Sequence, residues 1–346
     1  EYPLFKELMR QTVESLNSAV AYTSDPKLLN TKTAVKAKSS AVSSRSGLDA
    51  VYSVLTGGAD QGVLPPAQVR RLEARIAATA DDTDTRIRLV RHYISYEVRE
   101  TPAVAKARLT HRLWFVRNRP EVTKYIIYGI FGRPDSKESG EYQTLRDEWL
   151  RQVAADKNNK AIRLNAMEFV EEIEPEVAKK ILSDGRTVDA AAYEFPFHLA
   201  RLVRSEIDAP DKKLDAEQRS KLNREVLEYG RIALVLIKKE RSSERDPDRG
   251  ELLVNLVRIA GQERDLQLAE SLGRELVIDF GSDINSAAYS EGSHIGNIAL
   301  GTVELSRGNV EKAAEHLLVS IKAPLRNTRG YFTNIDFSLA KDLFRK

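Results

Sequence analysis

Apolar residues recur at intervals of three and four along most of this chain, which is the period of an amphipathic helix. The pattern is continuous from about residue 67 onward. Helix starts and stops punctuate it: Thr101-Pro102, for example, joins an N-cap residue to a proline in the first helical turn. No long run alternates apolar and polar residues with the period of two that a half-buried strand requires. The pattern therefore predicts an all-α fold.

The predicted helices follow one another with short turns between them, as expected for a chain of antiparallel helix pairs. Residues 129–140 are expected to form a loop, and Asp184-Gly185 is expected to stop a helix. Pro196 requires either a kink or a helix start. The predicted helices are 67–80, 84–98, 101–117, 141–155, 160–172, 175–182, 187–206, 215–240, 248–260 and 263–280, with three more from about 286, 309 and 335.

The first 66 residues differ from the rest of the chain. A helical pattern runs from Leu4 to Val20, and serine and threonine then dominate residues 31–46 before Gly57-Gly58 and Pro65-Pro66 break the chain. We expect residues 1–66 to be a helical, Ser-rich capping segment and residues 67–346 to be a solenoid. A separate small module or a flexible linker are the alternatives for the first segment.

The segment from His294 to Pro324 predicts a tight helical hairpin. Small Gly301 and Ala313 allow two antiparallel helices to approach closely where they cross. Gly308 can adopt the left-handed conformation that ends a helix, and Asn309 can cap the next one. An ordinary, non-repetitive helical hairpin is the alternative interpretation.

The same spacing recurs elsewhere in the chain. Ile162, Ala166, Phe169, Ala178 and Leu182 have the relative offsets of Asn297, Gly301, Glu304, Ala313 and Leu317. A weaker register runs through Ser95, Val98, Ala107 and His111. Three such units in succession favour a repeat architecture over a single hairpin.

These spacings resemble the tetratricopeptide repeat, with Leu300-Gly301, Gly308-Asn309, Ala313 and Leu317 at expected positions and Asn297 and Glu304 in place of two aromatic residues. The chain resembles a loosely defined group of bacterial tetratricopeptide-like proteins that has no established activity. The matching stretches are 109–121 (LTHRLWFVRNRPE), 149–182 and 293–345. The resemblance implies an α-α superhelix of antiparallel helix pairs and contributes no catalytic residues.

Charge and apolar content narrow the classes of partner. The chain has 54 basic and 51 acidic residues, a net charge of +3, with the two signs interleaved. Because no basic stripe stands out, we do not expect a nucleic-acid partner. The longest apolar stretch, Ile232–Ile237, is far shorter than the roughly 20 residues of a membrane span, so no membrane span is expected. A protein or peptide partner remains the expectation.

The chain contains no cysteine, which removes disulfides, thiolate catalysis and cysteine-ligated metals. This composition fits an exported protein, periplasmic or secreted, better than a cytoplasmic one, although cysteine-free cytoplasmic proteins are common. The sequence begins at Glu1 without a methionine, and we expect that a start codon with a tag, or a signal peptide, has been removed.

No catalytic, cofactor or metal site is expected. None of the five histidines lies in a His-Glu-x-x-His frame or at metal-ligand spacing from another with a carboxylate beside it. The acidic runs 81–84 and 171–174 fit helix capping and dipole effects better than a catalytic pair. No phosphate loop, dinucleotide fingerprint or Gly-x-Ser-x-Gly elbow is present. We therefore expect a non-catalytic scaffold that binds a partner in a concave groove.

Aromatic residues gather between positions 93 and 131, including Tyr93, Trp114 and Phe115. A packed core between helix pairs is one interpretation, and a groove for a peptide is another, since Tyr, Trp and Arg dominate interface hot spots. The alternative function, a helical enzyme or small-molecule-binding protein, would place its site here.

The binding face can be estimated from the repeat register. In a tetratricopeptide-like stack the first helix of each pair lines the concave surface, so residues one turn apart on these helices should project into the groove. The partner-binding residues predicted in this way are His92, Tyr96, Arg163, Met167, Ile298 and Thr302.

Overall fold

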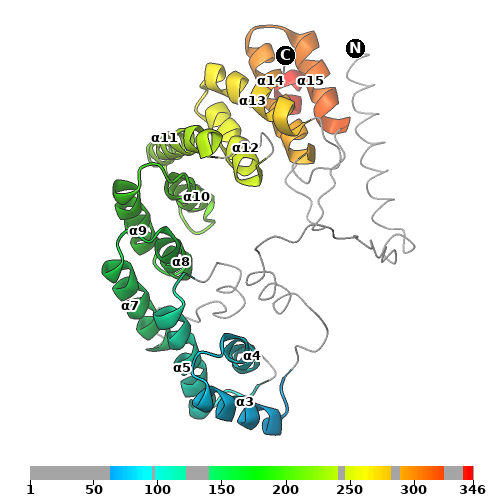
Figure 1. The fold of residues 1–346 in the computed structure, drawn as a ribbon. Coiled ribbons are helices and arrows are strands. Elements are labelled where there is room, and N and C mark those ends of the chain that lie inside the picture. Colours follow the sequence, from blue (N-terminus) through cyan, green and yellow to red (C-terminus); the bar gives the residue numbers. More distant parts are fainter. Residues whose placement is uncertain are drawn as a thin grey trace, which may run out of the picture. The chain divides into compact units, whose positions relative to one another are not determined.

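The computed structural model describes residues 63–95, 98–121, 140–240, 246–281, 289–322 and 338–345. Within these ranges it contains thirteen helices and no strand (Figure 1). The prediction of an all-α fold is therefore confirmed for the described residues. The predicted helix 4–20 and the Ser-rich segment lie outside them.

The chain divides into two compact units at the start of one helix, between Phe195 and Pro196. We call the described residues up to 195 the N-terminal unit and those from 196 onward the C-terminal unit. Each is described by itself.

The N-terminal unit is a succession of helices in which every consecutive pair is in contact. Asp82, Thr101 and Asn159 cap three of these helices, each accepting a backbone N–H three residues ahead at 3.0–3.2 Å. The helices are α3 (Pro66–Ala78), α4 (Thr83–Ile94), α5 (Pro102–Asn118), α7 (Gly140–Ala155), α8 (Lys160–Val170) and α9 (Pro175–Val188) (Figure 1).

The hairpin of α8 and α9 has a core built on small residues. Ala166 of α8 and Ala178 of α9 are both fully buried, as is Leu182. Tyr142 of α7 stacks on Phe169 of α8, with ring centroids 5.4 Å apart, so α7 joins the same core. The apolar positions that the repeat spacing selected in 162–182 are thus buried.

The expected stop at Asp184-Gly185 is wrong. Helix α9 continues through Gly185 to Val188, and Gly185 is buried within it. A Cβ on Gly185 would lie 2.6 Å from Cε1 of Phe195, so the glycine makes room for an aromatic ring instead of ending the helix. The next helix begins later than expected, at Glu194, and places Pro196 in its first turn, where proline is tolerated.

The C-terminal unit also consists of consecutive helices. Helix α12 contacts both α13 and α14, and α14 in turn contacts α13, α15 and α16. The helices are α10 (Glu194–Asp208), of which all but the first two residues belong to this unit, α11 (Ala216–Glu240), α12 (Pro247–Gln262), α13 (Leu266–Phe280), α14 (Tyr289–Ser306), α15 (Val310–Lys322) and α16 (Ser338–Phe344) (Figure 1).

In the turn between α14 and α15, Gly308 adopts the left-handed conformation that the sequence predicted, whereas the Asn309 side chain donates to Glu304 Oε2 at 2.7 Å. Gly308 is left-handed, with φ +82°. The backbone N–H groups of Gly308 and Asn309 donate to the carbonyls of Leu305 and Glu304 at 3.0 and 2.9 Å. This pair of bonds is the Schellman motif, which satisfies the last carbonyls of a helix.

The turn between α12 and α13 repeats this motif without a glycine. Arg264 adopts the left-handed conformation, with φ 58°. Arg264 and Asp265 donate backbone N–H groups to the carbonyls of Gly261 and Ala260 at 3.1 and 2.9 Å. The Asp265 side chain then caps α13 by accepting the Leu268 N–H at 3.0 Å. The two hairpins therefore share one turn geometry.

Helix α14 is the centre of the C-terminal unit. Every residue from 292 to 301 is buried. Gly301 lies against α15 and α16, because a Cβ there would be 3.2 Å from the carbonyl oxygen of Ala313 and would collide with Leu339. The predicted approach of Gly301 and Ala313 is confirmed.

Candidate functional site

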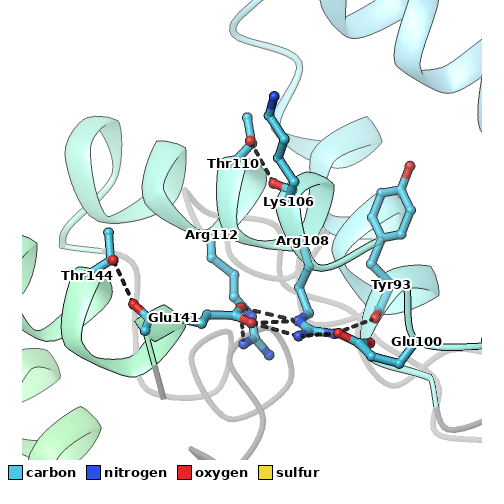
Figure 2. Close-up of polar contacts among 9 residues, drawn as sticks. Tyr93, Glu100, Lys106, Arg108, Thr110, Arg112, Glu141 and Thr144 are labelled. Carbon is cyan, nitrogen blue, oxygen red and sulfur yellow. Dashed lines mark hydrogen bonds and ion pairs between the residues drawn. The ribbon is translucent and has the colours of Figure 1, made fainter. Parts of the chain in front are cut away.

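A polar network in the described part of the N-terminal unit is centred on Glu141, in the first turn of α7 (Figure 2). Arg108 of α5 donates from Nη2 to Glu141 Oε2 at 2.7 Å, and Arg112 donates from Nη1 to Oε1 at 2.8 Å. Arg108 also donates to Glu100 at 2.9 Å and to the carbonyl of Tyr93 at 3.5 Å. One carboxylate thus joins two arginines that stand one turn apart on α5.

These ion pairs hold the Arg108 guanidinium in its charged form. The hydrogen bond to Glu141 raises the pKa of Arg108 above its ordinary value, and burial opposes this rise. An arginine that stays charged, paired with a carboxylate on the next helix, locks the orientation of α5 against α7.

A second carboxylate, Glu73 of α3, joins three helices. Tyr93 of α4 donates its hydroxyl to Glu73 Oε1 at 2.7 Å, and His111 Nε2 of α5 lies 3.0 Å from the same oxygen. The His111 hydrogen bond lowers the pKa of Glu73, against the effect of burial. Burial and the bond to Glu73 raise the pKa of Tyr93, so the phenol remains a hydrogen-bond donor at neutral pH.

The buried arginine Arg86 determines which nitrogen of His111 carries the proton. Arg86 Nη1 lies 3.1 Å from His111 Nδ1, and a guanidinium can only donate. Nδ1 must therefore accept, so Nε2 carries the hydrogen and donates it to Glu73. Arg86 also donates to the Ala80 carbonyl at 3.1 and 3.0 Å and stands 4.3 Å from the ring centroid of Trp114.

The aromatic region between 93 and 131 is core wherever the structure describes it fully. Tyr93 and Phe115 are buried, and Trp114 is half-buried beneath Arg86. Residues 122–139 of this region lie outside the described residues. The described aromatic side chains thus contribute to packing between helices.

The predicted partner-binding residues are placed very differently from one another. His92 is half-buried on α4, and its Nδ1 accepts the Leu64 N–H at 3.2 Å. Burial lowers the pKa of His92. Thr302 is half-buried and donates its hydroxyl to the Ile298 carbonyl at 2.8 Å. Tyr96 lies outside the described residues.

Three of the predicted residues do not project into open space, contrary to expectation. Met167 is fully buried. Ile298 is 5% exposed and belongs to a hydrophobic cluster that also contains Leu339 of α16. Arg163 is 4% exposed, and its Nε donates to the Lys157 carbonyl at 2.9 Å. The expectation fails because neighbouring helices cover these faces of α8 and α14.

The weakest repeat register does not match the observed helix boundaries. Ser95 and Val98 were assigned to a first helix, but α4 ends at Ile94 and both residues lie in the link to α5. His111, which the register assigned to a second helix, lies on α5 and belongs to the buried network around Glu73. The placement of His92 in a groove was inferred from this register and is therefore no longer supported by it.

A charged network in the C-terminal unit is likewise structural. The buried Arg249 of α12 pairs with Glu275 and Asp279 of α13, and Lys238 of α11 reaches Glu275 at 2.9 Å. Burial alone would lower the pKa of Arg249, but the hydrogen bonds to Asp279 and Glu275 raise it. These pairs tie α11, α12 and α13 together.

The roles of Glu73 and Glu141 in joining helices were not predicted from the sequence. Arg108 and Arg112, four residues apart, and an acidic residue at the start of the next helix were a usable signal, because that spacing places both arginines on one helix face. Glu73 offered no such signal, because its partners Tyr93 and His111 come from two other helices and periodicity does not say which helices pack together.

Two histidines of the C-terminal unit also have structural partners. His316 Nδ1 lies 2.9 Å from Asn297 Oδ1, and His294 Nδ1 lies 3.3 Å from the Ser320 carbonyl. In the described residues, no group of three or more His, Asp or Glu side chains is placed to hold a metal ion. No described helix has both the length and the apolar character needed to cross a membrane.

No protein-family model matches the sequence, and no curated protein matches it. A function for this chain must therefore be inferred from how its helices pack and from the charges on their surfaces.

Proposed function

We propose that the chain is a non-catalytic scaffold of the tetratricopeptide-like kind, a solenoid of antiparallel helix pairs that binds a protein or peptide segment. The observation that carries the proposal is the contact between α12 and α14, the first helices of two successive hairpins. When both helices of one hairpin contact the first helix of the next, as α12 and α13 contact α14, the hairpins form a continuous core and leave long surfaces for a partner.

A recurring alanine supports the repeat interpretation. Ala178, Ala269 and Ala313 stand near the start of the second helix in three hairpins, and all three are buried. Ala269 follows the left-handed residue Arg264 at the same distance along the chain as Ala313 follows the left-handed residue Gly308. We therefore count the hairpin α12–α13 as a further repeat, in addition to α8–α9 and α14–α15.

The proposal is tested by partner capture followed by direct titration. The full chain, immobilised, is exposed to an extract of its source cells, and each captured protein is then titrated against the free chain by calorimetry. A partner that binds in purified form supports the scaffold. Parallel thermal-shift measurements against metabolite and metal panels test the alternative, an enzyme or small-molecule-binding protein.

The two outcomes are distinguishable. A metabolite or metal that raises the unfolding temperature in a saturable way, with no protein partner captured, would replace the scaffold by the alternative. A scaffold is expected to show the reverse.

A further inference from the structure

The packing of α3, α4 and α5 brings the start of α3, the end of α4 and the start of α5 to one end of the N-terminal unit. Leu64, just before α3, donates its N–H to His92 near the end of α4. Arg108, in the first half of α5, reaches the carbonyl of Tyr93 at the end of α4. Antiparallel packing therefore places Arg70 and Arg71 of α3, and Lys106 of α5, near this end.

Four exposed cations belong to this end. They come from the first half of α3, the link between α4 and α5, and the first half of α5. We call them the basic end: Arg70, Arg71, Arg99 and Lys106.

The side chains of Lys106 and Arg108 leave α5 on opposite sides. Figure 2 shows Arg108 directed to Glu141 and Glu100, whereas Lys106 extends away from both carboxylates. The Tyr93 phenol points to the same side as Lys106 (Figure 2), and its hydroxyl bonds to Glu73 of α3. Lys106 thus lies on the side of α5 that faces away from Glu141 and Glu100.

Among the described residues, each carboxylate near the basic end already has a partner. Glu100 pairs with Arg108, Glu141 pairs with Arg108 and Arg112, and Glu73 accepts hydrogen bonds from Tyr93 and His111. Within the described part of the chain, the four cations of the basic end form no ion pair or side-chain hydrogen bond.

The charge balance of the region agrees with this. The described residues between 63 and 121 carry twelve arginine or lysine residues and six aspartate or glutamate residues, and eleven of the twelve cations are arginine. Arginine presents a planar fork of donors that matches a carboxylate in two-point contact, and it is favoured where carboxylates are recognised.

From these observations we propose that the basic end binds an acidic polypeptide segment. The inference rests on the proposed scaffold function and deepens it by naming the chemistry of the partner. A carboxylate-bearing chain fits better than a nucleic acid, because the four cations belong to one end of short helices and, among the described residues, form no extended stripe that could follow a phosphate backbone. It also fits the near-neutral balance of the whole chain.

The test uses the full chain and a defined probe, fluorescein-labelled decaglutamate, with binding followed by fluorescence anisotropy. Decaglutamine serves as the uncharged control. One variant reverses the basic end: Arg70→Glu, Arg71→Glu, Arg99→Glu and Lys106→Glu. A matched variant reverses four exposed cations of the C-terminal unit that also make no described side-chain contact: Lys213→Glu, Arg219→Glu, Lys221→Glu and Lys239→Glu. Circular dichroism confirms that both variants are folded.

We expect the wild type to bind decaglutamate and not decaglutamine. The basic-end variant should bind roughly tenfold more weakly or worse, since each exposed ion pair contributes only a modest share. The affinity of the matched variant should remain within about twofold of the wild-type value, although its net charge equals that of the basic-end variant. Raising the salt from about 50 to about 300 mM should weaken wild-type binding, because exposed charges are screened.

Three results would overturn the inference. They are no binding of decaglutamate, equal losses in both variants, or tighter binding of oligo(dT) or phosphatidylserine vesicles than of decaglutamate. A captured protein that binds the wild type and the basic-end variant equally would refute the basic end and leave the scaffold intact. Failure to capture any partner, by contrast, would count against the scaffold itself.

Discussion

Replacing Gly301 by alanine tests the crossing of α14 with α15 and α16, because helix propensity and packing predict opposite signs for the change in the free energy of unfolding. Helix propensity alone predicts a gain of about 1 kcal/mol, because glycine is unfavourable inside a helix. The structure predicts a loss. The new Cβ would lie 3.1 Å from Cβ of His316 and 3.2 Å from the Ala313 carbonyl oxygen, and it would collide with Leu339.

The magnitude follows from these contacts. Overpacking a core costs about 1–3 kcal/mol, and the upper half of that range applies because a backbone carbonyl and a neighbouring Cβ cannot rotate away. After subtraction of the propensity gain, Gly301→Ala should lower the free energy of unfolding of the C-terminal unit by about 1–2 kcal/mol. The assay is urea denaturation followed by far-ultraviolet circular dichroism.

Gly261 provides the matched control. It lies in the last turn of α12, and a Cβ there would meet no atom within 4 Å. Gly261→Ala should therefore stabilise the unit by about 0.5–1 kcal/mol. In a Leu339→Ala background the cost of Gly301→Ala should shrink, since one of its collisions is gone. The reasoning is refuted if Gly301→Ala stabilises the protein as Gly261→Ala does.

Three further predictions concern single residues. Arg264→Gly should raise the stability by about 0.5–1 kcal/mol, because glycine adopts φ 58° without steric cost; an unchanged thermal midpoint would contradict this. Glu141→Gln should cost about 1–3 kcal/mol in urea denaturation, since Arg108 and Arg112 lose a partly buried carboxylate, and a loss below a few tenths would show that the pairs are fully solvated. The pKa of Glu73 is lowered in the folded state, so its contribution is present above the ordinary Glu pKa and is lost as the pH falls through the depressed value. Glu73→Gln should therefore reduce the dependence of the urea midpoint on pH over the acidic range below about pH 5, and identical acid profiles would argue against the bond to His111.

Local signals predicted the helices well. Thr101-Pro102 marks the start of α5, and Gly308-Asn309 marks the turn between α14 and α15, because caps and left-handed residues depend on neighbouring positions in the chain. Gly185 was misread because its role depends on Phe195, a residue of another helix. A glycine that ends a helix and one that admits a ring look alike in the sequence.

The candidate site was much harder to predict than the fold. Which face of a first helix is open depends on how many neighbours cover it, and periodicity within one helix does not count neighbours. One signal was available: residues 292–301 contain no Asp, Glu, Lys or Arg, a composition typical of a helix buried on all sides. It argues against a groove at Ile298. The hairpin α12–α13 was not predicted as a repeat, because its left-handed turn residue is Arg264 and not a glycine.

The burial of α14 has a consequence for the order of folding during synthesis. Two of the helices that cover it, α15 and α16, follow it in the chain. The uncharged stretch 292–301 therefore leaves the ribosome after α12 and α13 but before α15 and α16, and the part of it around Gly301 stays uncovered until Leu339 of α16 has been made. Nascent chains with uncovered apolar surface are prone to aggregate. Translation that stalls between α15 and α16 would thus leave this part of α14 uncovered and raise the tendency of the nascent chain to aggregate.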